Sequence, residues 1–94
     1  MNLNELMRKL SEEHLYSELL IVNDKRSPGA YYGRYEVMLN RNSDGVFTLF
    51  WCDDRGMVCG AIQNVSEQEA CDRAYFVIKH RTEDIIEMNR SMRQ

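Results

Sequence analysis

The sequence lacks most of the features that mark membrane proteins, secreted proteins and disulfide-bonded proteins. No apolar run approaches the roughly 20 residues that a membrane-spanning helix needs, and Met1–Glu5 does not open a charged-then-apolar signal peptide. The three cysteines form no CxxC pair and no dense framework. Such cysteines are typical of free, mostly buried thiols in a reducing compartment. We therefore expect a cytoplasmic protein without disulfide bonds or membrane contact.

An excess of basic residues is also missing. Twelve Lys and Arg stand against fifteen Asp and Glu, which gives a formal net charge of −3. The arginines are dispersed among acidic residues, whereas proteins that bind nucleic-acid phosphates usually carry a basic stripe. The charge therefore argues against nucleic-acid binding and favours a basic or neutral protein partner.

What the sequence does contain is the composition of one folded domain. Hydrophobic residues make up 44% and charged residues 29% of the 94 residues, and this length is typical of a single domain. A chain this short buries roughly two-thirds of its unfolded surface. We expect one domain over residues 1–94, built around one small core.

The N-terminal part predicts a helix followed by a segment with two possible structures. Residues 3–13 form an amphipathic helical pattern, with Asn2 or Asn4 as the N-cap. Tyr16–Val22 would continue the helix only in a shifted register, and it runs into a turn signal, so we favour a short edge strand there. The apolar stripe of the helix consists of Leu3, Leu6, Met7 and Leu10.

The middle of the chain predicts an antiparallel meander. Arg34–Asn40 alternates between apolar and polar residues, and Val46–Gly60 has the pattern of a hairpin with a polar turn at Asp53–Gly56. From the turns we expect Leu39 opposite Phe47. The opposite sheet face is semi-apolar, and it either lies under residues 15–22 or stays uncovered by this chain. The expected core face comprises Tyr35, Val37, Leu39, Phe47, Leu49, Trp51, Val58 and Ile62.

A long helix is predicted at the C-terminus. Ser66 is its N-cap and Glu69 the capping-box acid three residues later. The helix either breaks near Thr82 or projects beyond the sheet, where residues 82–94 could form a homodimer. The fold class is thus α+β, a three- or four-stranded antiparallel meander packed by an N-terminal helix and a long C-terminal helix. The heptad stripe consists of Cys71, Ala74, Ile78, Arg81, Ile85, Met88 and Met92.

The sequence contains no pattern that is typical of a metal site or a catalytic site. The side chains that could bind zinc fall inside predicted strands and helices, whereas zinc ligands usually come in close pairs on turns. Asp53 and Asp54 are adjacent on a turn, and His14 has no identifiable partner, so no acid–base pair is apparent. We therefore expect no metal, no cofactor and no enzymatic activity. The possible ligands are Cys52, Cys59, Cys71 and His80.

The polar turn of the predicted hairpin is the best candidate for a contact site. Two carboxylates and a guanidinium would be held on a rigid turn, with two tyrosines from the preceding loop beside it. Aromatic residues and arginine surrounded by charges are typical of binding hot spots. An ordinary polar turn is an equally good interpretation. The predicted partner-binding residues are Asp53, Asp54, Arg55, Tyr31, Tyr32 and Asp24.

One stretch resembles a known class of proteins. An aromatic strand with Trp51, an acidic turn that closes with Arg55 and Gly56, and a helix start of the form Ser-Glu-x-Glu-Ala-Cys at 66–71 follow each other in this order. Over residues 34–80 the sequence resembles small immunity proteins of bacterial polymorphic-toxin and contact-dependent inhibition systems. The resemblance implies a cytosolic protein that binds one cognate toxin domain and neutralises it, without a cofactor. The homodimer through residues 82–94 is the alternative.

Overall fold

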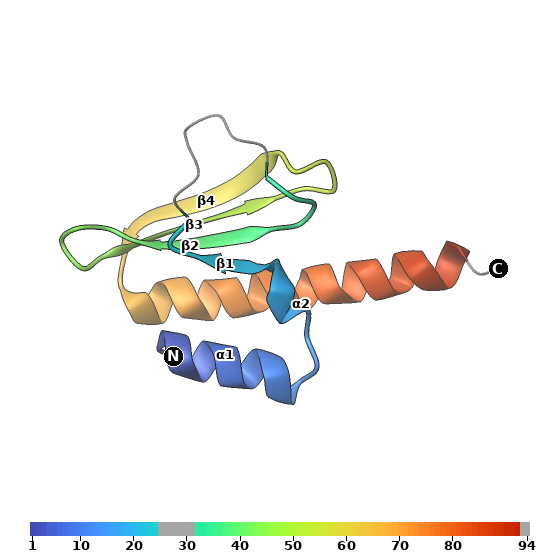
Figure 1. Cartoon of the computed structure of the whole chain (residues 1–94), viewed down its shortest axis with the longest axis horizontal. Helices are drawn as coiled ribbons and strands as arrows, with labels where there is room; N and C mark the ends of the chain where they lie inside the picture. The colour runs from blue at the N-terminus through green and yellow to red at the C-terminus, as the bar shows by residue number, and fades with distance from the viewer. Residues whose placement is uncertain (25–31, 93–94) are drawn as a thin grey trace.

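The computed structural model describes residues 1–24 and 32–92 (Figure 1). A short helix, a four-stranded sheet and a long helix follow each other along the chain, so the predicted α+β fold is confirmed. No helix in these residues is both long and apolar enough to cross a membrane. The elements are α1 (Leu3–Glu12), the 3-10 helix η1 (Ser17–Leu19), β1 (Leu20–Val22), β2 (Val37–Arg41), β3 (Phe47–Cys52), β4 (Val58–Val65) and α2 (Glu67–Met92).

The sheet has the strand order β1-β2-β3-β4, and three of its strands form the predicted meander. The segment that we favoured as an edge strand contributes β1, which lies at the edge of the sheet. β1 pairs with β2 in parallel, with Leu20 opposite Val37 and Val22 opposite Leu39. This orientation differs from the expected antiparallel meander, because the chain returns between β1 and β2 to the end of the sheet where β1 began.

The pairing of β2 with β3 is offset by two residues from the predicted register. Leu39 pairs with Leu49, not with Phe47. The expected register left residues 41–45 in the turn, whereas the Asn42 N–H already donates to the Val46 carbonyl at 2.7 Å. The side-chain period of a strand is two, so this offset leaves every residue on its predicted face.

The pairing of β3 with β4 is irregular, and here one predicted core residue is wrong. Trp51 pairs with Gly60 while the next residue, Cys52, pairs with Val58, so Cys59 is an extra residue in β4. A bulge of this kind reverses the side to which the flanking side chains point. Val58 is therefore 51% exposed instead of lying in the core.

The core lies between the sheet and the two helices. Leu6 and Leu10 of α1 are fully buried, and Asn2 caps this helix by accepting the Glu5 N–H at 2.8 Å. Met7 was expected in the same stripe, but it is 44% exposed. Trp51 and Ile62 pack against the core while partly exposed. The buried core comprises Leu6, Leu10, Leu20, Val37, Leu39, Phe47, Leu49, Ala70, Cys71, Ala74, Tyr75 and Ile78.

The long helix is continuous, and its end projects. Ser66 caps α2 as predicted, with its hydroxyl accepting the Glu69 N–H at 3.1 Å. Thr82 starts no second helix; it is buried, and its hydroxyl oxygen accepts the Tyr16 N–H at 3.0 Å. Beyond this residue the heptad stripe leaves the core, and Met92 is 80% exposed. Figure 1 shows this red end of α2 extending past the sheet, in a molecule with extents of 50 × 32 × 17 Å.

Candidate functional site

The turn between β3 and β4, Asp53–Gly56, is here called the hairpin tip. The Asp53 carboxylate accepts the backbone N–H groups of Met57 at 3.0 Å and Arg55 at 2.9 Å. These two hydrogen bonds, the one from Met57 first, lower the pKa of Asp53 from its usual value of 3.8. Gly56 closes the turn with a φ of +79°. The tip is therefore held in one conformation by its own aspartate.

Tyr32 lies beside the hairpin tip, as predicted. A side chain at Gly56 would collide with the Tyr32 carbonyl oxygen, so the two backbones are in close contact. The Tyr32 ring packs edge-on against Phe50, with 5.3 Å between ring centroids. The Tyr35 N–H donates to the Asp53 carbonyl at 2.9 Å and ties the same segment to the tip.

Two of the predicted contact residues do not join this group. The Asp24 N–H donates to the Asn40 side chain at 2.9 Å, and Asn40 pairs with Thr48 near the start of β3. At ~3.3 Å per residue, this position lies roughly 17 Å from the tip along the strand. Tyr31 lies outside the described residues. The partner-binding roles of Asp24 and Tyr31 stay predictions, but Asp24 belongs to the opposite end of the sheet.

Arg81 links the hairpin tip to α2, and the sequence reasoning missed this role. Its guanidinium lies 5.0 Å from the centroid of the Tyr35 ring, donates to the Cys59 sulfur at 3.4 Å and pairs with Asp84 at 3.7 Å. The charge of Arg81 also contributes to the low pKa of Asp53. The available signal was its place as the one charged residue of the heptad stripe. The projecting half of α2 thus starts directly beneath the tip.

Exposed apolar side chains gather at this end of the molecule. Among the described residues, five of the seven large hydrophobic side chains that are exposed lie either beside the tip or on the end of α2. Figure 1 shows both segments on the same side of the molecule. Exposed apolar side chains at one end of a molecule can form an interaction surface. We call it the apolar end; its residues are Met57 (65% exposed), Val58 (51%), Ile86 (43%), Met88 (37%) and Met92 (80%).

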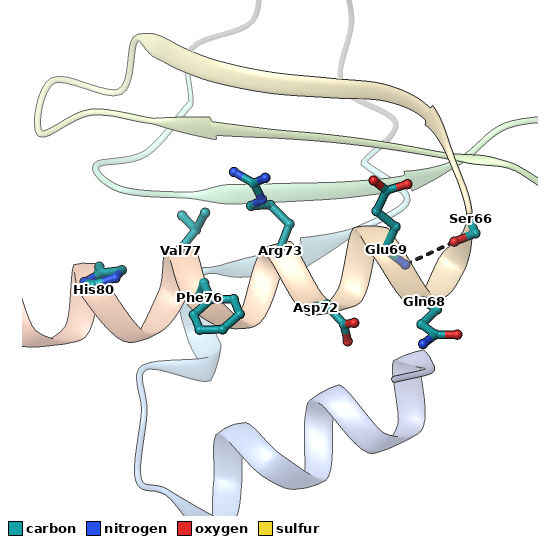
Figure 2. A pocket seen from close by; sticks show the side chains of 8 residues that line it. All are labelled: Ser66, Gln68, Glu69, Asp72, Arg73, Phe76, Val77 and His80. Atoms are coloured by element: carbon teal, nitrogen blue, oxygen red, sulfur yellow. Dashed lines mark hydrogen bonds between the residues drawn. The ribbon is translucent and has the colours of Figure 1, made fainter.

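A separate groove of about 650 Å³ runs along the first half of α2 (Figure 2). Phe76 is 56% exposed at its rim and packs edge-on against Tyr75, with 5.5 Å between ring centroids. Figure 2 shows Arg73 and Val77 directed toward the sheet and Asp72 toward α1. Small molecules are usually bound in concave pockets that bury most of their surface. A groove that lies on one helix and is open to solvent is better suited to contact with another protein. Its lining residues are Ser66, Gln68, Glu69, Asp72, Arg73, Phe76, Val77 and His80.

The possible metal ligands are dispersed in the structure. Cys52 and Cys71 are buried free thiols, and Cys59 is exposed at the bulge of β4. Burial, more than any other cause, raises the pKa of Cys71 to about 11, so its reactive thiolate form is suppressed. In the part of the chain that the structure describes, no three His, Cys, Asp or Glu residues are grouped so that they could hold a metal ion.

The site is thus an exposed surface built from a turn and its neighbours. A charged turn held by its own hydrogen bonds, an aromatic ring beside it and several exposed apolar side chains can bind a protein by shape, charge and burial of apolar area. The resemblance to immunity proteins stays a prediction. No family model, no curated protein and no solved structure matches this chain.

Proposed function

We propose that the protein is a binding module that docks its apolar end and hairpin tip onto a partner protein, and that the partner is a bacterial toxin domain that it neutralises. The observation that carries the docking proposal is the concentration of exposed apolar side chains at one end, beside a preformed charged turn. The sequence resemblance to immunity proteins supports the choice of partner. A preformed turn loses little conformational entropy on binding, which favours affinity.

The charges of this end favour a basic or neutral partner. Residues 53–58 and 83–92 together hold five acidic residues and two arginines, which is an excess of three acids. With Arg81, which lies at the same end, the excess is two acids, a mild acidic bias. Arg81, at the corner, is already paired with Asp84. Charges of this kind mainly set the association rate and the specificity, whereas the apolar side chains supply affinity.

Co-expression with a candidate toxin domain tests this function. The natural candidate is the C-terminal domain of the protein made from the neighbouring upstream reading frame. We expect the chain to restore growth to cells that make this domain and to bind it in a one-step pull-down. If the chain neither binds nor protects, the toxin-neutralising proposal is wrong.

The contact surface is tested with matched charge changes. Asp54→Lys should slow association with a basic partner and weaken the dependence of the association rate on salt, because it removes an attractive charge. The Asp54 side chain takes no part in the hydrogen bonds that hold the tip, so the turn should stay formed. Asp44→Lys makes the same charge change on the β2–β3 turn at the other end of the sheet and should leave binding unchanged. It also removes the 3.4 Å hydrogen bond that the Asp44 carboxylate accepts from the Val46 N–H, so circular dichroism checks that this variant is folded. Asp53 is kept in both variants, since its carboxylate holds the turn. Equal effects of the two changes would place the contact elsewhere.

Homodimerisation through residues 82–94 is the second candidate. It is favoured by the projection of α2, which leaves Ile86, Met88 and Met92 exposed. Sedimentation of the full chain should then give a dimer, and a chain that ends at Asp84 should be a monomer. This truncation keeps buried Thr82 and the Arg81–Asp84 ion pair, so the domain stays intact. An unchanged mass would exclude a dimer formed by this end.

A further inference from the structure

The groove on α2 carries an exposed aromatic side chain next to an open hollow. Phe76 is 56% exposed, although Tyr75 supports its ring from one side. Figure 2 shows the ring at the outer face of the helix, between side chains that point toward the sheet and side chains that point toward α1. An exposed aromatic beside a hollow of about 650 Å³ can insert into the same hollow of a second molecule.

The charges along this groove are segregated along the helix axis. Glu69 and Asp72 lie toward the N-terminal end, and Arg73 and His80 lie toward the C-terminal end. Asp72 is already paired with the Met1 ammonium group at 2.7 Å. His80 Nδ1 lies 3.8 Å from the Glu83 carboxylate, which leaves the second ring nitrogen of His80 for another contact. The groove therefore presents the Glu69 carboxylate at one end and this ring nitrogen at the other.

This arrangement is self-complementary for two antiparallel helices. Rotation by half a turn about the midpoint between Ala74 and Tyr75 brings Glu69 opposite His80 of a second copy, and Arg73 opposite its Phe76. The first pair can form a hydrogen bond or an ion pair, and the second is a cation–π pair. Each pair occurs twice across the two-fold axis. A parallel arrangement would instead place Glu69 against Glu69, so the charge pattern selects the antiparallel one.

The open edge of the sheet is a poorer surface for a second copy. β4 is an edge strand in the described part of the chain, but its pairing with β3 is irregular near both ends. Bulges of this kind protect edges from pairing with another strand. Contact between side chains of α2 is therefore favoured over extension of the sheet.

We infer that a second copy of this chain docks antiparallel on the groove of α2, with Phe76 of each copy inserted against Arg73 of the other. The inference is independent of the proposed function, because the groove lies on the first half of α2 and the apolar end lies beyond Arg81. Analytical ultracentrifugation of the full chain over a range of concentrations should show reversible dimerisation. A monomer at every concentration, up to the millimolar range, overturns the inference.

Two substitutions locate the dimer surface. Phe76→Glu should weaken dimerisation by about 30-fold or more, the effect of losing an interface hot spot. Met7→Glu changes a side chain that is 44% exposed on α1, and it should have no effect on association. Dimerisation that survives Phe76→Glu but is lost with Met92→Glu would move the interface to the end of α2 and overturn the inference.

A charge-reversal pair tests the antiparallel register. Glu69→Lys should weaken dimerisation, because lysine then lies opposite His80 of the second copy. Adding His80→Glu should restore it, since each glutamate then lies opposite a lysine. Circular dichroism shows whether each variant keeps its helical content and melting temperature. A double variant that is folded but associates no better than Glu69→Lys alone contradicts this register.

Discussion

Trp51 and Gly60 face each other across β3 and β4. The indole occupies the space into which a side chain at position 60 would extend, and an ideal Cβ built there collides with its ring atoms. Gly60 therefore lets Trp51 lie flat across the neighbouring strand and pack on the core. The glycine is required here for close approach and not for an unusual backbone conformation.

The Gly60→Ala change should lower the free energy of unfolding by about 1–3 kcal/mol, the usual cost of overpacking a core. Urea unfolding followed by circular dichroism measures the loss. The control is the same change in a Trp51→Leu background, where the smaller side chain leaves room for the added methyl group. If Gly60→Ala costs the same in both backgrounds, the collision with the indole is not its cause.

Asp53 makes the stability of the hairpin dependent on pH. Its folded pKa lies below 3.8, mainly because it accepts hydrogen bonds from Met57 and Arg55. The carboxylate therefore stabilises the fold fully above the unfolded pKa, and this contribution is lost as the pH falls through the lowered folded pKa. An NMR titration should give Asp53 a pKa under 3.8.

The matched variant is Asp53→Asn, whose amide oxygen can still accept these hydrogen bonds. It should remove the part of the acid-induced destabilisation that Asp53 causes, while leaving the hairpin formed at neutral pH. A pKa of Asp53 at or above 3.8 in the native protein would contradict the two hydrogen bonds.

At the scale of elements, α2 consists of two halves with different surroundings. Its first half has a buried stripe that ends at Thr82, and its second half has only half-buried Ile85 and exposed side chains. The contact of Thr82 with the Tyr16 N–H fixes the chain between α1 and β1 against the point where this change occurs. The threonine thus joins the N-terminal segment to the long helix.

Thr82→Val should lower the free energy of unfolding by about 1–3 kcal/mol, because the partly buried Tyr16 N–H would lose its acceptor while the shape is kept. Chemical denaturation measures this. Thr82→Ser keeps the hydroxyl and loses only a methyl group, so it should cost less. A valine variant as stable as the native protein would show that water replaces this hydrogen bond.

The two halves of α2 should also differ in hydrogen exchange. Helices without tertiary packing are marginally stable in water, so the amides of residues 86–92 should exchange much faster than those of residues 70–82. Mass spectrometry of exchanged peptides makes the comparison at low protein concentration. Equal protection of both halves would mean that the apolar end is covered in solution, as the dimer through residues 82–94 requires.

At the scale of the whole molecule, hydrophobic patterning was enough to predict the layers. The predicted register of β2 and β3 was wrong, but the predicted core residues were still correct, because an offset of two residues keeps Val37, Leu39 and Leu49 in the core. The bulge at Cys59 did matter, because a single extra residue turned Val58 outward. The hydrophobic pattern indicates the two-residue period of a strand, but it does not indicate at which residue a β-bulge occurs.

The candidate site could be predicted only in part. Turn chemistry located the hairpin tip, and Tyr32 was placed beside it correctly. Asp24 was predicted to join the tip in the contact site, but the parallel pairing of β1 with β2 puts it at the other end of the sheet. Arg81 was predicted only as the charged residue of the heptad stripe, whereas in the structure it contacts Cys59 of β4.

The sequence by itself determined the α+β class, the cap at Ser66 and the charged turn, because these depend on periodicity and on side chains within a few residues of each other. Only the tertiary structure decided the strand directions, the bulge and the end at which exposed apolar side chains gather. Those features depend on contacts between residues far apart in the chain. The tertiary structure also decided that α2 projects, because a helix stops packing against a sheet where the sheet ends and not where the helix's own hydrophobic pattern changes.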